Sequence, residues 1–120
     1  MVVILLTMSN PMRRSEGHIG KNILKLTPIG TSMEEVLEYA EKKGWEIWYV
    51  SYEFGFLKQY GYWTLEEHSD NVNIGEKSIG VVASRYKTYF FIDTVVKIFW
   101  GFDENSKLIE ISVSKEFNVP

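Results

Sequence analysis

Polar and apolar residues alternate most clearly in the last third of the chain. The segment KLIEISVSK (107–115) places Ile109, Ile111 and Val113 on one face and polar residues on the other, which predicts a half-buried strand. The segment 94–102 alternates in the same way. Between the two segments lies Asp-Glu-Asn-Ser-Lys (103–107), a run of turn-forming residues. We therefore predict a β-hairpin in this part of the chain.

One helix is predicted upstream, in TSMEEVLEYAEKKG (31–44). Thr31 or Ser32 can act as the N-cap, since each has a glutamate three residues later, and Gly44 is the expected end. The apolar residues recur at the spacing of one helical face and are Met33, Val36, Leu37 and Ala40. The helix should pack on one side only.

The other segments predict strands and connections. Residues 45–54, 56–65 and 78–91 are rich in aromatic and β-branched residues, which favours strands, whereas 66–77 has the composition of a loop. Residues 1–27 are expected to form an irregular N-terminal arm, whose first eight residues are either an edge strand or a disordered start. The predicted fold is an α+β two-layer sandwich over 28–115, with one main amphipathic helix on a four- to five-stranded antiparallel meander sheet.

The composition is that of a globular protein. The chain has 120 residues, of which 45% are hydrophobic, 24% charged and 15% aromatic, so we expect one domain over 1–120 with a core of its own. Cysteine is absent, which excludes disulfides and thiolate metal sites. The apolar start is too short for a secretory signal and no segment is long enough to span a membrane, so a cytoplasmic location is expected.

Charge is distributed unevenly along the chain. Residues 31–70 carry nine acidic and three basic side chains, whereas residues 1–30 carry four basic ones and one acidic one. An acidic middle argues against nucleic acid as a partner, because phosphate binding needs a basic surface. It is compatible with a basic protein partner, or with a helix whose acidic face is simply solvated.

Catalytic and metal-binding motifs are not evident. The turn at 103–107 fails as a calcium loop, because Lys107 occupies a ligand position and Leu108 the position of the required glycine. Asp103 and Glu104 are consecutive on an exposed turn, where nothing would separate their pKa values. His18 and His68 lie in different predicted loops without a second ligand at a suitable spacing. We expect no enzyme, no cofactor and no metal.

An aromatic cluster between residues 49 and 63 indicates a possible function. Its rings cannot all face one core if the strands alternate, so some should be exposed beside acidic residues and form a protein-binding surface. The alternative is that they fill a wide, shallow core. The predicted partner-binding residues are Tyr60, Tyr62, Trp63, Glu66, Glu67 and Asp70, with Glu34, Glu38 and Glu41 as a second acidic face.

Two segments carry a family resemblance: PIGTSMEEVLEYAEKKGWEI (28–47) and the segment from Ser78 to Lys115 that ends in FWGFDENSKLIEISVSK. Together they resemble small immunity proteins of bacterial toxin systems, including contact-dependent growth inhibition. The order of helix and hairpin is also similar to the fold of the outer-membrane assembly lipoprotein SmpA and of β-lactamase inhibitor protein. The motifs are structural, and the lipidated cysteine of the lipoproteins is missing.

The resemblance implies a protein that binds and neutralises one cognate toxin, expected to be a nuclease, by covering its active site. A scaffold or assembly protein that binds a peptide or self-associates through its sheet is the second hypothesis. A small-molecule-binding or enzymatic domain is the third.

Overall fold

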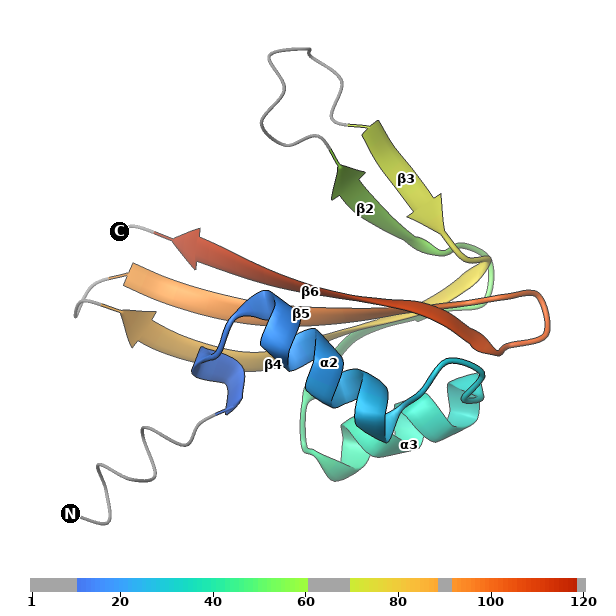
Figure 1. The fold of residues 1–120 in the computed structure, drawn as a ribbon, viewed down its shortest axis with the longest axis horizontal. Helices are drawn as coiled ribbons and strands as arrows, with labels where there is room; N and C mark the ends of the chain where they lie inside the picture. Colours follow the sequence, from blue (N-terminus) through green and yellow to red (C-terminus); the bar gives the residue numbers. More distant parts are fainter. Residues whose placement is uncertain (1–10, 61–69, 89–91, 119–120) are drawn as a thin grey trace.

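The computed structural model describes residues 11–60, 70–88 and 92–118. Two helices lie on one face of an antiparallel sheet, and a separate hairpin projects from the opposite side (Figure 1). Residues 1–8, for which an edge strand or a disordered start was predicted, lie outside the described residues. The elements are η1 (Pro11–Arg13), α2 (Glu16–Leu26), α3 (Met33–Lys42), β1 (Glu46–Ser51), β2 (Phe56–Tyr60), β3 (Asp70–Ile74), β4 (Lys77–Thr88), β5 (Ile92–Phe102) and β6 (Leu108–Asn118).

The main sheet has four strands in the order β1-β4-β5-β6, and all neighbours are antiparallel. The last three strands form a meander, because β4, β5 and β6 follow one another along the chain and pair in that order. β1 pairs with the free edge of β4, and the hairpin β2–β3 is inserted in the connection between them. The predicted α+β sandwich is therefore confirmed, with four strands in its sheet.

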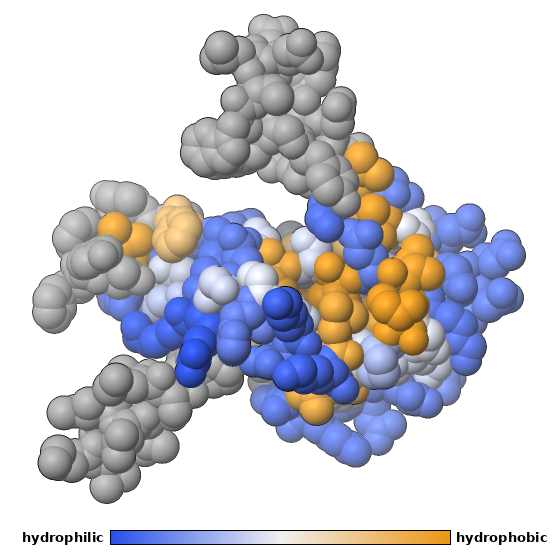
Figure 2. All heavy atoms as spheres, in the orientation of Figure 1, coloured by the Kyte–Doolittle hydropathy of each residue, from blue (hydrophilic) through white to orange (hydrophobic). Residues whose placement is uncertain are grey.

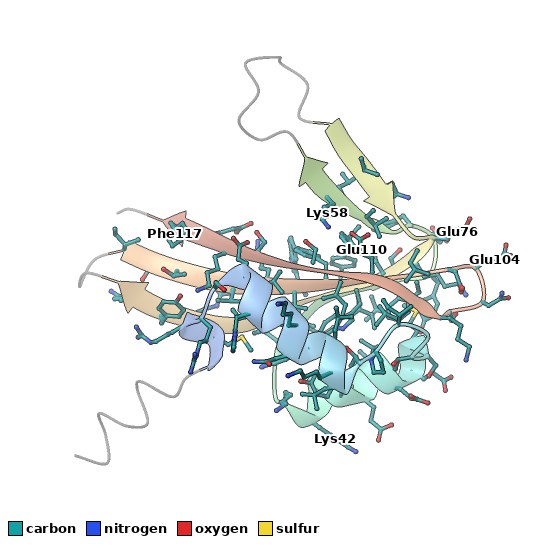
Figure 3. The ribbon with its side chains drawn as sticks, in the orientation of Figure 1. Lys42, Lys58, Glu76, Glu104, Glu110 and Phe117 are labelled. Carbon is teal, nitrogen blue, oxygen red and sulfur yellow. The ribbon has the colours of Figure 1, made fainter. Side chains whose placement is uncertain are left out.

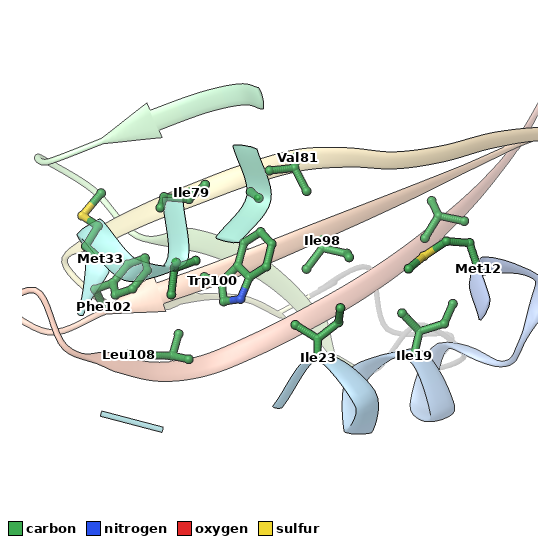
Figure 4. Packing of buried hydrophobic residues seen from close by; sticks show 13 residues of the cluster. Met12, Ile19, Ile23, Met33, Ile79, Val81, Ile98, Trp100, Phe102 and Leu108 are labelled. Carbon is green, nitrogen blue, oxygen red and sulfur yellow. The ribbon is translucent and has the colours of Figure 1, made fainter. Parts of the chain in front are cut away.

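The core lies between the sheet and the helices. Side chains at alternate positions of β5, including Ile98, Trp100 and Phe102, point toward the helices and are completely buried. Ile19 and Ile23 of α2 cover one side of this row (Figure 4). Met33, Val36 and Ala40 of α3 are also buried in the core. Burying a side chain of this size contributes roughly 1.5–3 kcal/mol, so this alternation dictates which face the helices cover.

The helix α2 corrects the prediction of an irregular arm over residues 1–27. Ser15 is its N-cap and accepts a hydrogen bond from the backbone N of His18 at 3.2 Å. Gly17 and Gly20 lower the intrinsic helix propensity of this segment, which is why its sequence resembles a loop. Ile19 and Ile23 lie one turn apart and are both buried, so tertiary packing on β6 stabilises the helix instead.

The predicted helix 31–44 is confirmed as α3. Ser32 is its N-cap, with its Oγ accepting from the backbone N of Glu35, and Gly44 adopts a positive φ just beyond its end. The start of the helix is fixed to the β5–β6 turn, since Met33 N donates to Ser106 O at 2.9 Å and Leu108 N donates to Thr31 O at 2.8 Å. The two segments of the family resemblance thus meet in space.

The predicted hairpin turn at 103–107 is also confirmed. Asp103 Oδ1 accepts hydrogen bonds from the backbone N of Asn105 at 2.9 Å and of Lys107 at 3.0 Å. Ser106 adopts a φ of 61°, which completes the reversal of the chain. The carboxylate of Asp103 is therefore used to hold the turn together.

The hairpin β2–β3 departs from the predicted pattern. A strand over 56–65 and a loop over 66–77 were expected. Residues 56–60 form β2, residues 61–69 lie outside the described residues, and residues 70–74 of the predicted loop form β3. The two strands pair with each other and not with the main sheet. Asparagine and aspartate are poor strand formers, and pairing with β2 outweighs that preference in β3.

Candidate functional site

The face of the sheet opposite the helices carries a layer of aromatic rings. Phe99 of β5 lies at its centre, with ring centroids 6.1 Å from Trp48, 6.5 Å from Tyr49 and 5.8 Å from Phe56. Phe54 extends the layer by stacking on Tyr49 at 6.1 Å. These rings are separate from the core beneath the helices, so the sheet is covered by apolar side chains on both faces. We call these five residues the aromatic layer.

A β-bulge explains why two consecutive residues join the aromatic layer. The register between β1 and β4 shifts between Ile47 and Tyr49. In a regular strand Trp48 and Tyr49 would point to opposite faces, but an extra residue lets both lie on the same side. Both rings contact Phe99 as a result.

Two glycines make room for the rings on the sheet. A Cβ atom at Gly80 would collide with the ring of Tyr49, and one at Gly101 would lie 3.0 Å from Phe56 Cε1. Aromatic rings that lie flat over strand glycines restore the packing that the missing side chain would supply. Phe56 is only 3% exposed, which ties the base of the β2–β3 hairpin to β5.

Three aromatic side chains in and beside the aromatic layer are open to solvent. Trp48 and Phe54 are more than half exposed, and so is Tyr52, which precedes Phe54 in the β1–β2 connection. Ser51 shapes this connection, because its Oγ accepts from the backbone N of Glu53 and of Phe54. Several large apolar side chains are thus presented together on the surface, although the chain has an ordinary core of its own.

The ring of Trp48 contacts a cation at the edge of the aromatic layer. Lys97 Nζ lies 4.2 Å from the centroid of the Trp48 ring and 2.9 Å from Glu116 Oε2. The lysine is mostly buried, so its ammonium is held by the ring and the carboxylate at once. This contact fixes one side of the layer and leaves the other side, toward Phe54, open.

An acidic groove continues from the open side of the aromatic layer. It has a volume of about 480 Å³ and is lined by Tyr52, Glu53, Phe54, Asn73, Gly75, Glu76, Lys77 and Glu104. Glu76 and Glu104 lie close to the same end of the molecule (Figure 3). The Lys77 ammonium donates to Ser106 Oγ at 2.7 Å, whereas the three glutamates are exposed. We call this groove with its two aromatic side chains the aromatic–acidic surface.

The base of the hairpin is held over the sheet by an ion pair. Lys58 Nζ of β2 lies 2.9 Å from Glu110 Oε2 of β6, and both side chains are about one-third exposed. Figure 3 shows the two residues facing each other below the hairpin. Together with the packing of Phe56, the pair orients β2 and β3 and thereby one wall of the groove, which includes Asn73.

The predicted partner-binding residues fall into three groups. Tyr62, Trp63, Glu66 and Glu67 lie outside the described residues. Tyr60 and Asp70 are backbone partners at the end of the β2–β3 hairpin farthest from Phe56 and Ile74, and only their backbone is described. Glu34, Glu38 and Glu41 are exposed on α3, where Glu38 pairs with Lys42 at 3.2 Å. They lie on the helix side of the sheet, so the structure does not bring them to the aromatic–acidic surface.

Sequence reasoning missed the acidic residues of the groove. Glu76 was assigned to a loop and Glu104 to an isolated turn, and the two are 28 positions apart. They come together because Glu76 N donates to Phe102 O at 2.8 Å, which places the β3–β4 turn beside the β5–β6 turn. The exposure of Tyr52 and Phe54 agrees with the expectation that some rings of the cluster would be exposed.

Tyr49 is the one residue of the aromatic layer with a titratable side chain. Burial raises the pKa of the Tyr49 phenol above its usual value, and a hydrogen bond with Ser78 opposes this shift. Within 11–60, 70–88 and 92–118, no group of three histidine, aspartate or glutamate side chains is placed to hold a metal ion. Over the same residues, no helix is both long and apolar enough to cross a membrane.

Comparison with protein-family models, curated proteins and solved structures gave no match to this chain. The resemblance to immunity proteins therefore stays a prediction from the two sequence segments.

Proposed function

We propose that this chain is an immunity protein that binds one bacterial toxin and neutralises it by covering the toxin's active site. The observation that supports the proposal most directly is the exposure of Tyr52 and Phe54 beside the glutamates of the acidic groove. Aromatic side chains are enriched among the residues that dominate protein interfaces. The resemblance of residues 28–115 to immunity proteins supplies the class of partner.

The two kinds of side chain would have separate roles in binding. Tyr52 and Phe54 would enter pockets of the toxin, where truncation of such an anchor typically costs about 2 kcal/mol or more of binding free energy. Glu53, Glu76 and Glu104 would attract a basic surface and raise the association rate. Because Phe54 stacks on Tyr49 and its backbone N donates to Ser51 Oγ, little conformational freedom of Phe54 would be lost on binding.

A nuclease is the toxin class that fits this surface best. A nuclease active site binds phosphates and is accordingly basic, so a groove with three exposed glutamates is complementary to it. The toxin would have to be bound before it reaches nucleic acid, and a cytoplasmic location is part of the proposal.

The proposal is tested by co-expression of the tagged chain with the product of the neighbouring gene. We expect a stoichiometric complex and loss of that product's toxicity. The double variant Tyr52→Ala/Phe54→Ala should neither form the complex nor remove the toxicity. Phe117→Ala is a matched control, because Phe117 is as exposed as Tyr52 but lies near the C-terminal end of β6 (Figure 3). A harmless neighbour without a complex would refute the immunity function.

A scaffold protein that adds a partner strand to its sheet is the second candidate, and the open edge of β6 favours it. Residues outside the sheet already form hydrogen bonds at two places on this edge. The backbone of Leu108 accepts from Gly30 N and donates to Thr31 O, and Glu16 Oε2 accepts from Lys115 N at 3.3 Å. Between them, no strand of the described chain pairs with the outer side of β6, and Ile109 is 43% exposed. Self-association measured by analytical ultracentrifugation, and its loss on Ile109→Lys, would support this candidate.

A further inference from the structure

A second hollow lies on the other side of the molecule, between the helices and β4. It has a volume of about 530 Å³ and is lined by η1, α2, the C-terminal end of α3 and β4. This volume falls within the range of roughly 300–1,000 Å³ that small-molecule sites occupy. We call it the helix groove. It shares no lining residue with the groove of the aromatic–acidic surface.

The lining of the helix groove is mostly apolar and aromatic. Met12 and Ile23 supply aliphatic surface, and Figure 4 shows both on the helix side of the sheet. Tyr39 and Trp45 meet edge to face with their ring centroids 5.6 Å apart. Trp45 also stacks on the buried Trp100 at 6.4 Å, so its ring is supported from within the core. This wall is held in place before any ligand arrives.

The charge at the rim of the helix groove is positive. Among the described residues that line it, the charged ones are Lys25, next to the last residue of α2, and Lys43, the C-cap of α3. Cations at these positions complement the negative ends of the helix dipoles, which accounts for their presence on each helix separately. Because both helices end here, both ammonium groups gather at the same hollow. The local charge is thus opposite to the net charge of −3 of the whole chain.

Neither lysine is neutralised by a carboxylate of the described chain. The ion pairs there involve Lys42, Lys58, Arg85 and Lys97 instead. Lys43 Nζ lies 5.7 Å from the centroid of the Tyr39 ring, which keeps it above the aromatic wall. Burial raises the pKa of Tyr39, so its phenol stays protonated at neutral pH and adds no negative charge.

We propose that the helix groove binds a small amphipathic anion, with an apolar body of the size of a medium-length acyl chain and one carboxylate. The apolar body would lie against Trp45, Met12 and Ile23. The carboxylate would lie at the rim between Lys25 and Lys43. A neutral ligand of the same shape would leave both ammonium groups without a partner, and a cationic ligand would be repelled.

The test uses octanoate and 1-octanol, which share an apolar chain and differ in charge. Titration of the full-length ¹⁵N-labelled protein should produce saturable shifts of the Trp45 indole signal and of amides in 22–26 and 39–45. We expect octanoate to bind at least about tenfold more tightly than 1-octanol. The double variant Lys25→Gln/Lys43→Gln should reduce octanoate binding to the level of 1-octanol and leave 1-octanol binding unchanged.

Lys107→Gln is the control, because Lys107 is an exposed lysine in the β5–β6 turn and does not line the helix groove. It should bind octanoate as the wild type does. The proposal is overturned by equal affinity for both ligands, by a double variant that binds octanoate normally, by shifts that gather elsewhere, or by the absence of saturable shifts. The amide spectrum of each variant shows whether it is folded, so misfolding cannot be mistaken for loss of binding.

Discussion

The indole Nε1 of Trp100 donates a hydrogen bond to Thr27 Oγ1 at 3.2 Å, between residues 73 positions apart. Trp100 and Thr27 are both buried, so water cannot replace either partner. The same hydroxyl donates to Ile23 O at 2.8 Å and thus also ends α2. One side chain therefore fixes the position of α2 on the sheet and satisfies the polar atom of the largest core residue.

The first prediction concerns this bond. Thr27→Val keeps the shape of the side chain but leaves the indole N–H of Trp100 buried and unpaired. We expect it to lower the free energy of unfolding by about 1–3 kcal/mol. Urea denaturation followed by tryptophan fluorescence measures the loss.

Thr31→Val is the control for this prediction. The Thr31 hydroxyl also donates to a backbone carbonyl, that of Pro28, but it is exposed, so solvent can take its place. Thr31→Val should therefore lower the free energy of unfolding by less than about 1 kcal/mol. Equal effects of the two variants would mean that the Trp100–Thr27 bond contributes nothing of its own.

The second prediction concerns the glycine under the aromatic layer. In Gly80→Ala the new methyl group would collide with the Tyr49 ring and push it from the sheet. We expect a loss of about 1–3 kcal/mol in the free energy of unfolding. In a protein that already carries Tyr49→Ala, Gly80→Ala should lower the free energy of unfolding by less, because the colliding ring is gone. A double-mutant cycle measures the difference.

Gly17→Ala provides the matched control. Gly17 lies in the first turn of α2, and a Cβ atom there would have no neighbour within 4 Å. Alanine should be neutral or stabilise the helix by up to about 1 kcal/mol. If Gly80→Ala were equally harmless, the glycine would not be what allows the Tyr49 ring to lie on β4.

These glycines also show why the sequence predicted some elements and missed others. The helix 31–44 and the strands of the C-terminal hairpin follow from patterns within ten or so neighbouring residues, because apolar spacing and caps are local. The helix α2 does not, since Gly17 and Gly20 disfavour it and its packing on distant segments such as β6 stabilises it. Propensity was a poor guide wherever a distant segment completed the packing.

The candidate site depends on distant contacts even more. The exposed rings could be expected from their number, but not which of them would be exposed. Phe56 is buried because Gly101 of β5 leaves room for it. Glu76 and Glu104 become neighbours only through the pairing of two turns. A sequence pattern contains none of these relationships.

The third prediction concerns the alkaline pH dependence of stability. Burial raises the pKa of Tyr49 in the folded protein above the unfolded value of about 10. The folded state therefore retains the phenol proton at a pH where the unfolded state has released it. This contribution is complete below about pH 10 and is lost as the pH rises through the folded pKa.

Urea denaturation between pH 8 and pH 11 tests this expectation. The free energy of unfolding of the wild type should fall more steeply above pH 10 than that of Tyr49→Phe, which has no proton to lose at this position. Parallel curves for the two proteins would show that Tyr49 titrates alike in the folded and unfolded states.

The last prediction distinguishes the aromatic–acidic surface from the acidic face of α3 as the site that attracts a basic partner. Glu76→Lys/Glu104→Lys reverses two charges of the groove, and Glu34→Lys/Glu41→Lys reverses two on the helix. All four side chains are exposed and form no ion pair with the described residues, so neither change should unfold the protein. The net charge is the same in both variants.

Surface plasmon resonance against the co-expressed partner, at low and at physiological salt, separates the two surfaces. If the groove faces the partner, Glu76→Lys/Glu104→Lys should lower the association rate by about tenfold or more at low salt, and the difference should narrow as salt screens the charges. Glu34→Lys/Glu41→Lys should have a small effect, because α3 lies on the other side of the sheet. The reverse ranking would move the interface to the helix, where the sequence had placed its second acidic face.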